Sequence, residues 1–209
     1  MKTRLYNHIS GLVLVAAMSF GAPALADGML DRGVGSERSS LNPHINFDAA
    51  AGWIQLDAYE GLVTFDSAGQ VIPGAAESWT VSDDGMTYTF TLRKGLKWSN
   101  GDPLIAQDFV NGALRTLDPA TGTDKGYYFY SVIQIRSTEA MAFGEATDPA
   151  TLGITAPDDR TVVVEMLTPA PHIPDIMAGF AFSPLHAPSF AAHGPGVFID
   201  PALVVTNGA

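Results

Sequence analysis

The chain has 209 residues, of which 46% are hydrophobic and 16% charged, so it can bury a sizeable core and is not a disordered segment. Its 22 acidic and 11 basic residues give a formal net charge of −11, which argues against the clustered cations that nucleic-acid binding requires. The absence of cysteine excludes disulfides, thiolate metal sites and a cysteine nucleophile. Composition therefore indicates an acidic globular protein.

The N-terminus has the features of an export signal. A short basic start precedes an apolar stretch, residues 11–20, which is too short to span a bilayer comfortably. Residues 24–26, Ala-Leu-Ala, then supply the small side chains of a cleavage pattern. We expect cleavage between Ala26 and Asp27 and export of the remaining chain, with an uncleaved membrane anchor as the alternative.

Three segments are predicted to form β-hairpins. The strongest pattern is at residues 79–98, where large apolar residues alternate with threonines after a Ser-Asp-Asp-Gly turn. Residues 62–72 surround an Asp-Ser-Ala-Gly turn, and in residues 157–167 a Pro-Asp-Asp-Arg turn precedes a run of valines. These patterns are typical of antiparallel strands.

Helices are predicted between and before these hairpins. One is indicated by apolar residues with helical spacing: Phe109, Val110, Ala113, Leu114 and Leu117. A second covers about residues 50–60 and is expected to bury Trp53, Leu56 and Tyr59 or near neighbours of these residues. Residues 118–150 are rich in Gly, Thr, Asp and Ala, and are interpreted as loops with a short helix or two. The predicted fold class is therefore α/β in the broad sense, with helices and strands mixed along the chain (mixed α+β).

Known catalytic and metal-binding motifs do not occur in the sequence. A G-x-S-x-G elbow, an H-E-x-x-H pair and a phosphate-binding loop are all missing. Four histidines share no metal-ligand spacing and are interpreted as structural: His44, His172, His186 and His193. The adjacent acids at 83–84 and 158–159 are interpreted as solvated turn residues rather than general acid–base pairs. We predict that the protein is not an enzyme and uses no cofactor.

Six short motifs carry a family resemblance. They are Ser40–His44, Glu60–Val63, Pro73–Trp79, Tyr88–Pro103, Asp108–Val110 and Val205–Ala209. In this order and spacing, the set resembles the family 5 extracellular solute-binding proteins, the oligopeptide, dipeptide and nickel receptors of ABC importers. One departure is Ile105, where the family usually has Thr or Ser as a helix cap, so the helix is expected to rely on Asp108 and the helix dipole.

The resemblance implies a bilobed fold of the periplasmic binding protein type, which closes over its ligand. It implies a discontinuous first lobe made of residues 27–59 and 169–209, and an inserted small β-rich domain made of residues 60–168. Family members continue beyond the last motif, so the opposing C-terminal lobe is expected to be absent and the chain truncated.

The resemblance also implies function. The protein is expected to capture oligopeptides in the periplasm and deliver them to an inner-membrane ABC permease, as a monomer without a nucleic-acid partner. In the oligopeptide receptors, the segment after the first motif lies along the bound peptide, which implies Phe47, Asp48 and Ala49 as ligand-binding residues. An aromatic residue of the inserted domain also faces the ligand, which implies Tyr127 or Tyr128. The alternatives are a receptor for nickel, haem, an opine or a sugar, or a truncated product that binds no solute.

Overall fold

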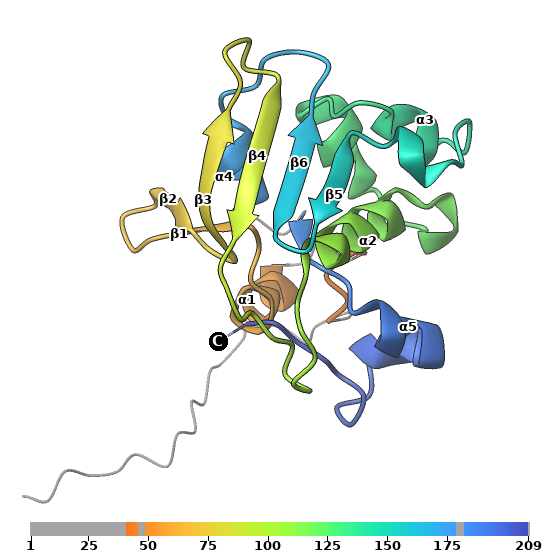
Figure 1. Cartoon of the computed structure of the whole chain (residues 1–209). Helices are drawn as coiled ribbons and strands as arrows, with labels where there is room; N and C mark the ends of the chain where they lie inside the picture. Colours follow the sequence, from red (N-terminus) through yellow and green to blue (C-terminus); the bar gives the residue numbers. More distant parts are fainter. Residues whose placement is uncertain (1–40, 46–48, 179–181, 209) are drawn as a thin grey trace, which may run out of the picture. The chain divides into compact units, whose positions relative to one another are not determined.

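A four-stranded antiparallel sheet forms the centre of the structure, a computed structural model that describes residues 41–45, 49–178 and 182–208 (Figure 1). Its strands, in spatial order, are β3 (Ala76–Val81), β4 (Thr87–Leu92), β6 (Thr161–Glu165) and β5 (Ile154–Asp158). A separate two-stranded hairpin is formed by β1 (Val63–Phe65) and β2 (Val71–Pro73). All three hairpins predicted from the sequence are confirmed.

The β3–β4 hairpin shows why the alternating pattern produces this sheet. Tyr88, Phe90 and Leu92 on β4 all point to the buried side, and Phe90 is fully buried. Phe90 lies opposite Trp79 of β3 and Val162 of β6, so both strands next to β4 contribute to one apolar layer. The turn between β3 and β4 includes Gly85, whose φ of 71° lies in the left-handed region that glycine adopts without strain.

Helix α2 (Ala106–Leu117) packs its apolar side against β5 and β6, as its spacing predicts (Figure 1). Ile105 has no side-chain acceptor with which to cap this helix. The carboxylate of Asp108 instead accepts the backbone N–H of Ile105 at 3.1 Å and the indole N–H of Trp98 at 3.0 Å. The expected reliance of this helix on Asp108 is confirmed.

Helix α1 (Ala49–Ala58) begins and ends close to the predicted bounds, but its buried side is not the predicted one. Trp53 is 54% exposed and Leu56 41% exposed, so the expectation that both are buried is wrong. Tyr59 is buried as expected, and the buried helix residue one turn before it is the polar Gln55. Apolar residues occur on all sides of this segment, so periodicity alone does not select the face that packs.

The remaining elements are short, as expected for residues 118–150. They are 3-10 turns at Pro119–Thr121 and Pro149–Thr151, a π-helical turn at Tyr128–Val132, and helix α3 (Thr138–Ala142). The C-terminal part contains α4 (Ile173–Met177), α5 (Ala187–His193) and a 3-10 turn at Gly194–Phe198. None of the helices in the described ranges is long and apolar enough to cross a membrane.

Candidate ligand-binding site

The predicted ligand-binding residues fall into two segments, residues 47–49 and 127–128, of which the structure describes the second in full. Outside the described residues lie Phe47 and Asp48, together with the expected cleavage residues Ala26 and Asp27. Ala49 is the first residue of α1. Tyr127 and Tyr128 stand at the start of the π-helical turn, on the connection that follows α2.

The turn at residues 41–45, which leads into the first predicted segment, is held by side chains from distant elements. The side-chain oxygen of Asn42 accepts the backbone N–H of His44 at 3.1 Å and a guanidinium N–H of Arg115 at 3.0 Å. The Asn42 carbonyl accepts the side-chain amide of Gln55 at 3.2 Å. Two helices, α1 and α2, therefore fix one short turn through buried and partly buried polar groups.

Lys125 links the turn at residues 41–45 to the start of the tyrosine segment. Its Nζ donates to the carbonyl of Pro43 at 2.6 Å, and only 2% of the residue is exposed. Burial lowers the pKa of its ammonium group to about 8, because desolvation disfavours the charged form. Pro43 precedes Phe47 by four residues, and Lys125 precedes Tyr127 by two. This bond keeps the chain leading to Phe47 close to the base of the tyrosine segment.

His44, a residue of this turn, is buried in its neutral form. Its Nε2 lies 3.1 Å from the carbonyl of Ser183, so Nε2 carries the proton and donates it. Burial, reinforced by the charge of Arg115, lowers the pKa of His44 to about 3. A Cβ added at Gly112 would lie 2.1 Å from the Ser183 carbonyl, so this close approach of α2 requires glycine.

Arg115 connects α2 to the C-terminal part of the chain. Its guanidinium carbon lies 4.6 Å from the ring centroid of Phe190 and 5.0 Å from that of Phe198. Burial lowers the pKa of Arg115, opposed by the charge of Asp118, but a guanidinium remains charged at any physiological pH. Its contacts with two rings and with Asn42 make Arg115 a fixed cationic brace.

The tyrosine segment presents an aromatic surface. Tyr127 is 50% exposed, whereas Tyr128 is partly buried and packs against the core. The ring centroid of Tyr127 lies 6.1 Å from that of Tyr128 and 6.1 Å from that of Tyr130, both in edge-to-face geometry. Tyr127 is therefore the better placed of the two predicted tyrosines to contact a ligand, and Tyr128 supports it.

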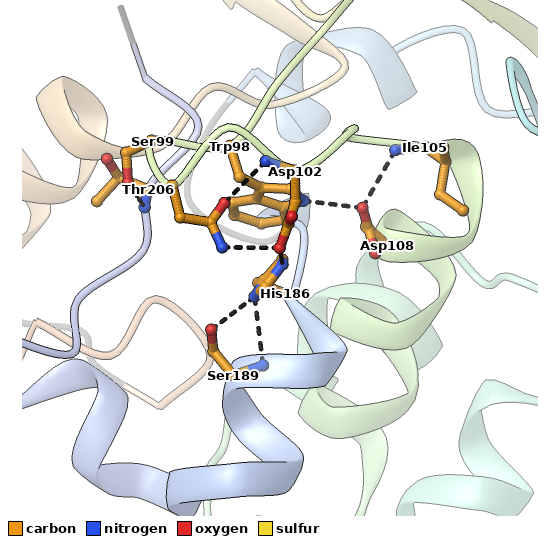
Figure 2. A network of polar contacts seen from close by, with 9 residues as sticks. Trp98, Ser99, Asp102, Ile105, Asp108, His186, Ser189 and Thr206 are labelled. Carbon is orange, nitrogen blue, oxygen red and sulfur yellow. Dashed lines mark hydrogen bonds and ion pairs between the residues drawn. The ribbon is translucent and has the colours of Figure 1, made fainter.

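A second polar network has the residue types of a hydrolytic triad (Figure 2). Nε2 of His186 lies 3.0 Å from a carboxylate oxygen of Asp102, and its Nδ1 lies 2.7 Å from the hydroxyl oxygen of Ser189. The ring of Trp98 packs edge-on against the imidazole, with 5.2 Å between centroids. In Figure 2, this group joins the loop before α2 to the start of α5.

The same network is explained as a structural clamp. Nδ1 of His186 accepts the backbone N–H of Ser189 at 3.3 Å, so this histidine caps α5. The hollow beside His186, Ser189 and Trp98 has a volume of only about 10 Å³, which leaves no room for a substrate. Trp98 is 2% exposed, so its ring belongs to the buried core.

The last motif folds back onto the earlier ones. The side-chain amide of Asn207 donates to the carbonyl of Glu60 at 2.8 Å and accepts the backbone N–H of Glu60 at 3.2 Å. Thr206 exchanges hydrogen bonds with Ser99, through its carbonyl at 2.8 Å and its N–H at 3.1 Å (Figure 2). The Glu60 carboxylate also accepts a hydrogen bond from Arg93 at 2.5 Å. Motifs separated by more than a hundred residues therefore contact one another in the folded chain.

In the described part of the chain, no group of three or more His, Cys, Asp and Glu residues could hold a metal ion. The acidic pairs of the sequence lie in turns. Asp84 accepts hydrogen bonds from Ser82 and Met86, and Asp158 accepts them from Arg160 and Thr161. These carboxylates stabilise hairpin turns, as their positions predict.

Comparison with known families identifies the chain. The family model of the bacterial extracellular solute-binding proteins, family 5 (Middle), matches residues 70–208. The chain belongs to this family. Its members are transport receptors and not enzymes, which confirms both the resemblance and the prediction that the protein has no catalytic function.

Named relatives agree with this membership. The chain is 38% identical over 174 residues to the probable deoxycholate-binding periplasmic protein YgiS of Escherichia coli, covering 83% of this chain and 32% of the relative. It is 42% identical over 138 residues to the periplasmic oligopeptide-binding protein OppA of Haemophilus influenzae, covering 66% of this chain and 25% of the relative. The chain thus spans about a third or less of the curated relatives it matches.

Solved structures confirm the fold class. The crystal structure of Haemophilus influenzae OppA in complex with the peptide RPPGFSPFR superposes with a TM-score of 0.79 at 37% identity, covering 84% of this chain and 34% of that one. The unliganded open form of MppA, a periplasmic murein tripeptide binding protein, gives a TM-score of 0.77 at 33% identity, covering 83% and 33%. The mixed α/β chain therefore has the fold of this part of a periplasmic binding protein.

Sequence reasoning missed the groups that hold the site together. Arg115 has a weak signal, because it is a charged residue beside the apolar stripe of the predicted α2 helix. Lys125 has none, since a lysine in a Gly- and Thr-rich connection is usually solvated. Only the folded chain shows that Lys125 reaches Pro43.

Proposed function

We propose that the chain forms part of a receptor that captures oligopeptides in the periplasm and delivers them to an inner-membrane ABC permease. The observation that carries this proposal is the bond from Lys125 to Pro43, which holds the chain leading to Phe47 beside the segment of Tyr127. In this arrangement the ring of Tyr127, which is 50% exposed, would be available to a peptide bound beside the turn at residues 41–45.

The proposed ligand-binding residues are Phe47, Asp48, Ala49, Tyr127 and Tyr128. The carboxylate of Asp48 would pair with the amino terminus of a peptide. The backbone near Ala49 would align the peptide, and the tyrosines would cover it. A receptor of this kind needs no catalysis, because the ligand only has to favour the closed form over the open one.

The proposed domain division follows the same reasoning. Residues 27–59 and 169–209 would form the first lobe, and residues 60–168 the inserted domain. The two hydrogen bonds between Glu60 and Asn207 support this boundary, since they lie where the inserted segment begins. We also propose that the N-terminal segment is an export signal cleaved between Ala26 and Asp27, and that the receptor is a monomer.

Native mass spectrometry of the protein purified from the cells that make it tests this function. We expect co-purified solutes with the masses of short peptides. Tyr127→Ala and Lys125→Met should reduce peptide occupancy, because the first removes the exposed ring and the second removes the link to Pro43. The matched control is Phe65→Ala, which removes an aromatic ring that is 43% exposed on the β1–β2 hairpin.

The outcomes separate this proposal from its alternatives. A bound metal, haem, opine or sugar would replace peptide as the substrate class. A steroid acid would do the same, since one relative at 38% identity is named a probable deoxycholate-binding protein. A protein that carries no solute and is not shifted by added peptides would contradict the proposal altogether.

A further inference from the structure

An open hollow lies beside the tyrosine segment. It has a volume of about 290 Å³ and lies between the end of α2, the loop at residues 118–126 and the end of α3. Its aromatic lining comes from Tyr127, Tyr130 and Phe143. Phe143 is 63% exposed and its ring centroid lies 5.5 Å from that of Tyr130, so three adjoining rings border this space.

The charged groups that line the hollow are all acidic. Asp118 and Asp124 both line it, and the lining includes no Lys, Arg or His side chain. Of the two nearby cations, Lys125 donates to Pro43, and Arg115 packs against phenylalanine rings while interacting electrostatically with Asp118. One oxygen of Asp118 already accepts the N–H of Ala120 at 2.8 Å, so Asp124 is the more available carboxylate.

We infer that this hollow binds a cationic side chain of the ligand, a guanidinium or alkylammonium group. Ring faces attract cations through their quadrupoles, and an adjacent carboxylate adds a charge partner. The aliphatic stem of an arginine or lysine would lie against Leu117 and Ala142, which also line the space. The inference deepens the proposed function, on which it rests for the ligand that carries the cation, and it predicts a preference for basic peptides.

The test uses a probe that needs no peptide. The isotope-labelled chain is titrated with n-butylguanidinium and, separately, with n-butylurea, its neutral isostere, and followed by two-dimensional NMR. We expect the amide signals of Gly122 and Gly126, which line the hollow, to shift with weak but saturable binding of n-butylguanidinium. The neutral isostere should bind several-fold more weakly. Salt at about 1 M, which shortens the screening length to about 3 Å, should narrow the difference.

Variants assign the effect to named groups. Tyr127→Ala should weaken binding of n-butylguanidinium about 2- to 5-fold, the range expected for one exposed cation–π contact. Asp124→Asn should weaken it about 2- to 4-fold, as for an exposed charge pair, and should leave n-butylurea unaffected. Asp124 is exposed, so this variant should fold normally. The matched control, Asp83→Asn, changes an exposed acid in the β3–β4 turn and should alter neither probe.

The results that overturn the inference differ from those that overturn the proposed function. Equal binding of the two probes, shifts confined to other regions, or no shift at Gly122 and Gly126 would each contradict cation binding in the hollow. Peptide found by native mass spectrometry together with an unresponsive hollow would reject this inference alone. A hollow that binds n-butylguanidinium in a protein that carries no peptide would reject the proposed function alone.

Discussion

The sheet region, residues 60–168, and the segments that flank it, residues 41–58 and 182–208, are stabilised in different ways. In the sheet region, the ladder of β3, β4, β6 and β5 buries an apolar layer that contains Phe90, Val162 and Val164. In the flanking segments, the buried groups include the polar residues Asn42, His44, Gln55, Ser183 and His186. The sheet region also buries polar residues, but only outside its strands: Asp108, Thr116, Lys125 and Thr138. Among the flanking residues, Asn42 bonds to Arg115 of α2 and His186 bonds to Asp102, both in the sheet region.

This difference shows where conformational uniqueness comes from in each region. An apolar layer tolerates small shifts, whereas each buried polar group must keep its partner or lose about 1–3 kcal/mol. His44 bonds to the carbonyl of Ser183, and Lys125 bonds to the carbonyl of Pro43. Both bonds require the turn at residues 41–45 to keep one position against these two segments. These polar contacts around the turn at residues 41–45, which we call the junction, are therefore the part of the fold with the more specific geometry. The sheet region is the part that better tolerates small changes in packing.

The largest expected effect tests the apolar layer. Phe90→Ala removes a fully buried ring from the central strand and should lower the free energy of unfolding by about 3–5 kcal/mol. Denaturant unfolding followed by circular dichroism measures this change. The control Phe65→Ala, at a position 43% exposed, should cost far less. Similar losses for both variants would show that the layer around Phe90 is not the main source of stability.

The next effect concerns acid stability of the junction. The unfolded chain protonates His44 near pH 6.5, but the folded chain does so only at a pKa of about 3. Between these values the unfolded state binds more protons, so stability falls as pH falls, by up to about 1.4 kcal/mol per pH unit. Arg115 and Lys125 face His44 and act in the same direction.

Replacing His44 by a residue that does not titrate isolates this contribution. His44→Gln keeps an amide donor for the Ser183 carbonyl, so it should flatten the loss of stability between pH 6.5 and pH 4 relative to the parent chain. Urea unfolding at several pH values gives the two slopes. Parallel slopes would mean that His44 is protonated in the folded chain or is not buried.

A smaller effect separates the junction from the sheet. Gly112→Ala places a Cβ 2.1 Å from the Ser183 carbonyl and should cost about 1–3 kcal/mol through displaced backbone. Hydrogen exchange should show lost protection first around Ser183 and the turn at residues 41–45. Gly126→Ala is the control, because its nearest contact would be an ordinary 3.6 Å to Leu117. Equal losses throughout β4 and β6 would contradict separate responses of the two regions.

The smallest effect concerns the clamp at α5. Ser189→Ala removes a hydroxyl that lies 2.7 Å from Nδ1 of His186 but leaves the backbone cap in place, so it should cost only about 0.5–1.5 kcal/mol. Neither the parent chain nor the variant should cleave a panel of peptides above a heat-inactivated control. Cleavage by the parent chain that is lost in Ser189→Ala would instead make this group a catalytic triad.

Sequence patterns predicted most of the sheet region but little of the junction. The alternation around Phe90 and the spacing of Phe109 with Ala113 and Leu117 each depend on a local period that only one kind of element satisfies. For α1 the same reasoning failed at Trp53 and Leu56, because the helix carries apolar residues on all its sides and its sequence therefore indicates no preferred buried face. The proposal of Tyr127 as a ligand-binding residue comes from the family resemblance, whereas its exposure is a property of the fold.

The sequence by itself determined the strands, the turns between them, the main helix and the family, because these depend on residues close together or on motifs in fixed order. The tertiary structure alone decided that Lys125 reaches Pro43, that Asn207 pairs with Glu60, and that His186 joins Asp102 to Ser189. Such contacts link residues far apart in the chain, and a polar side chain carries no local sign of the partner it will bury. They form only when the apolar layer has brought the segments together.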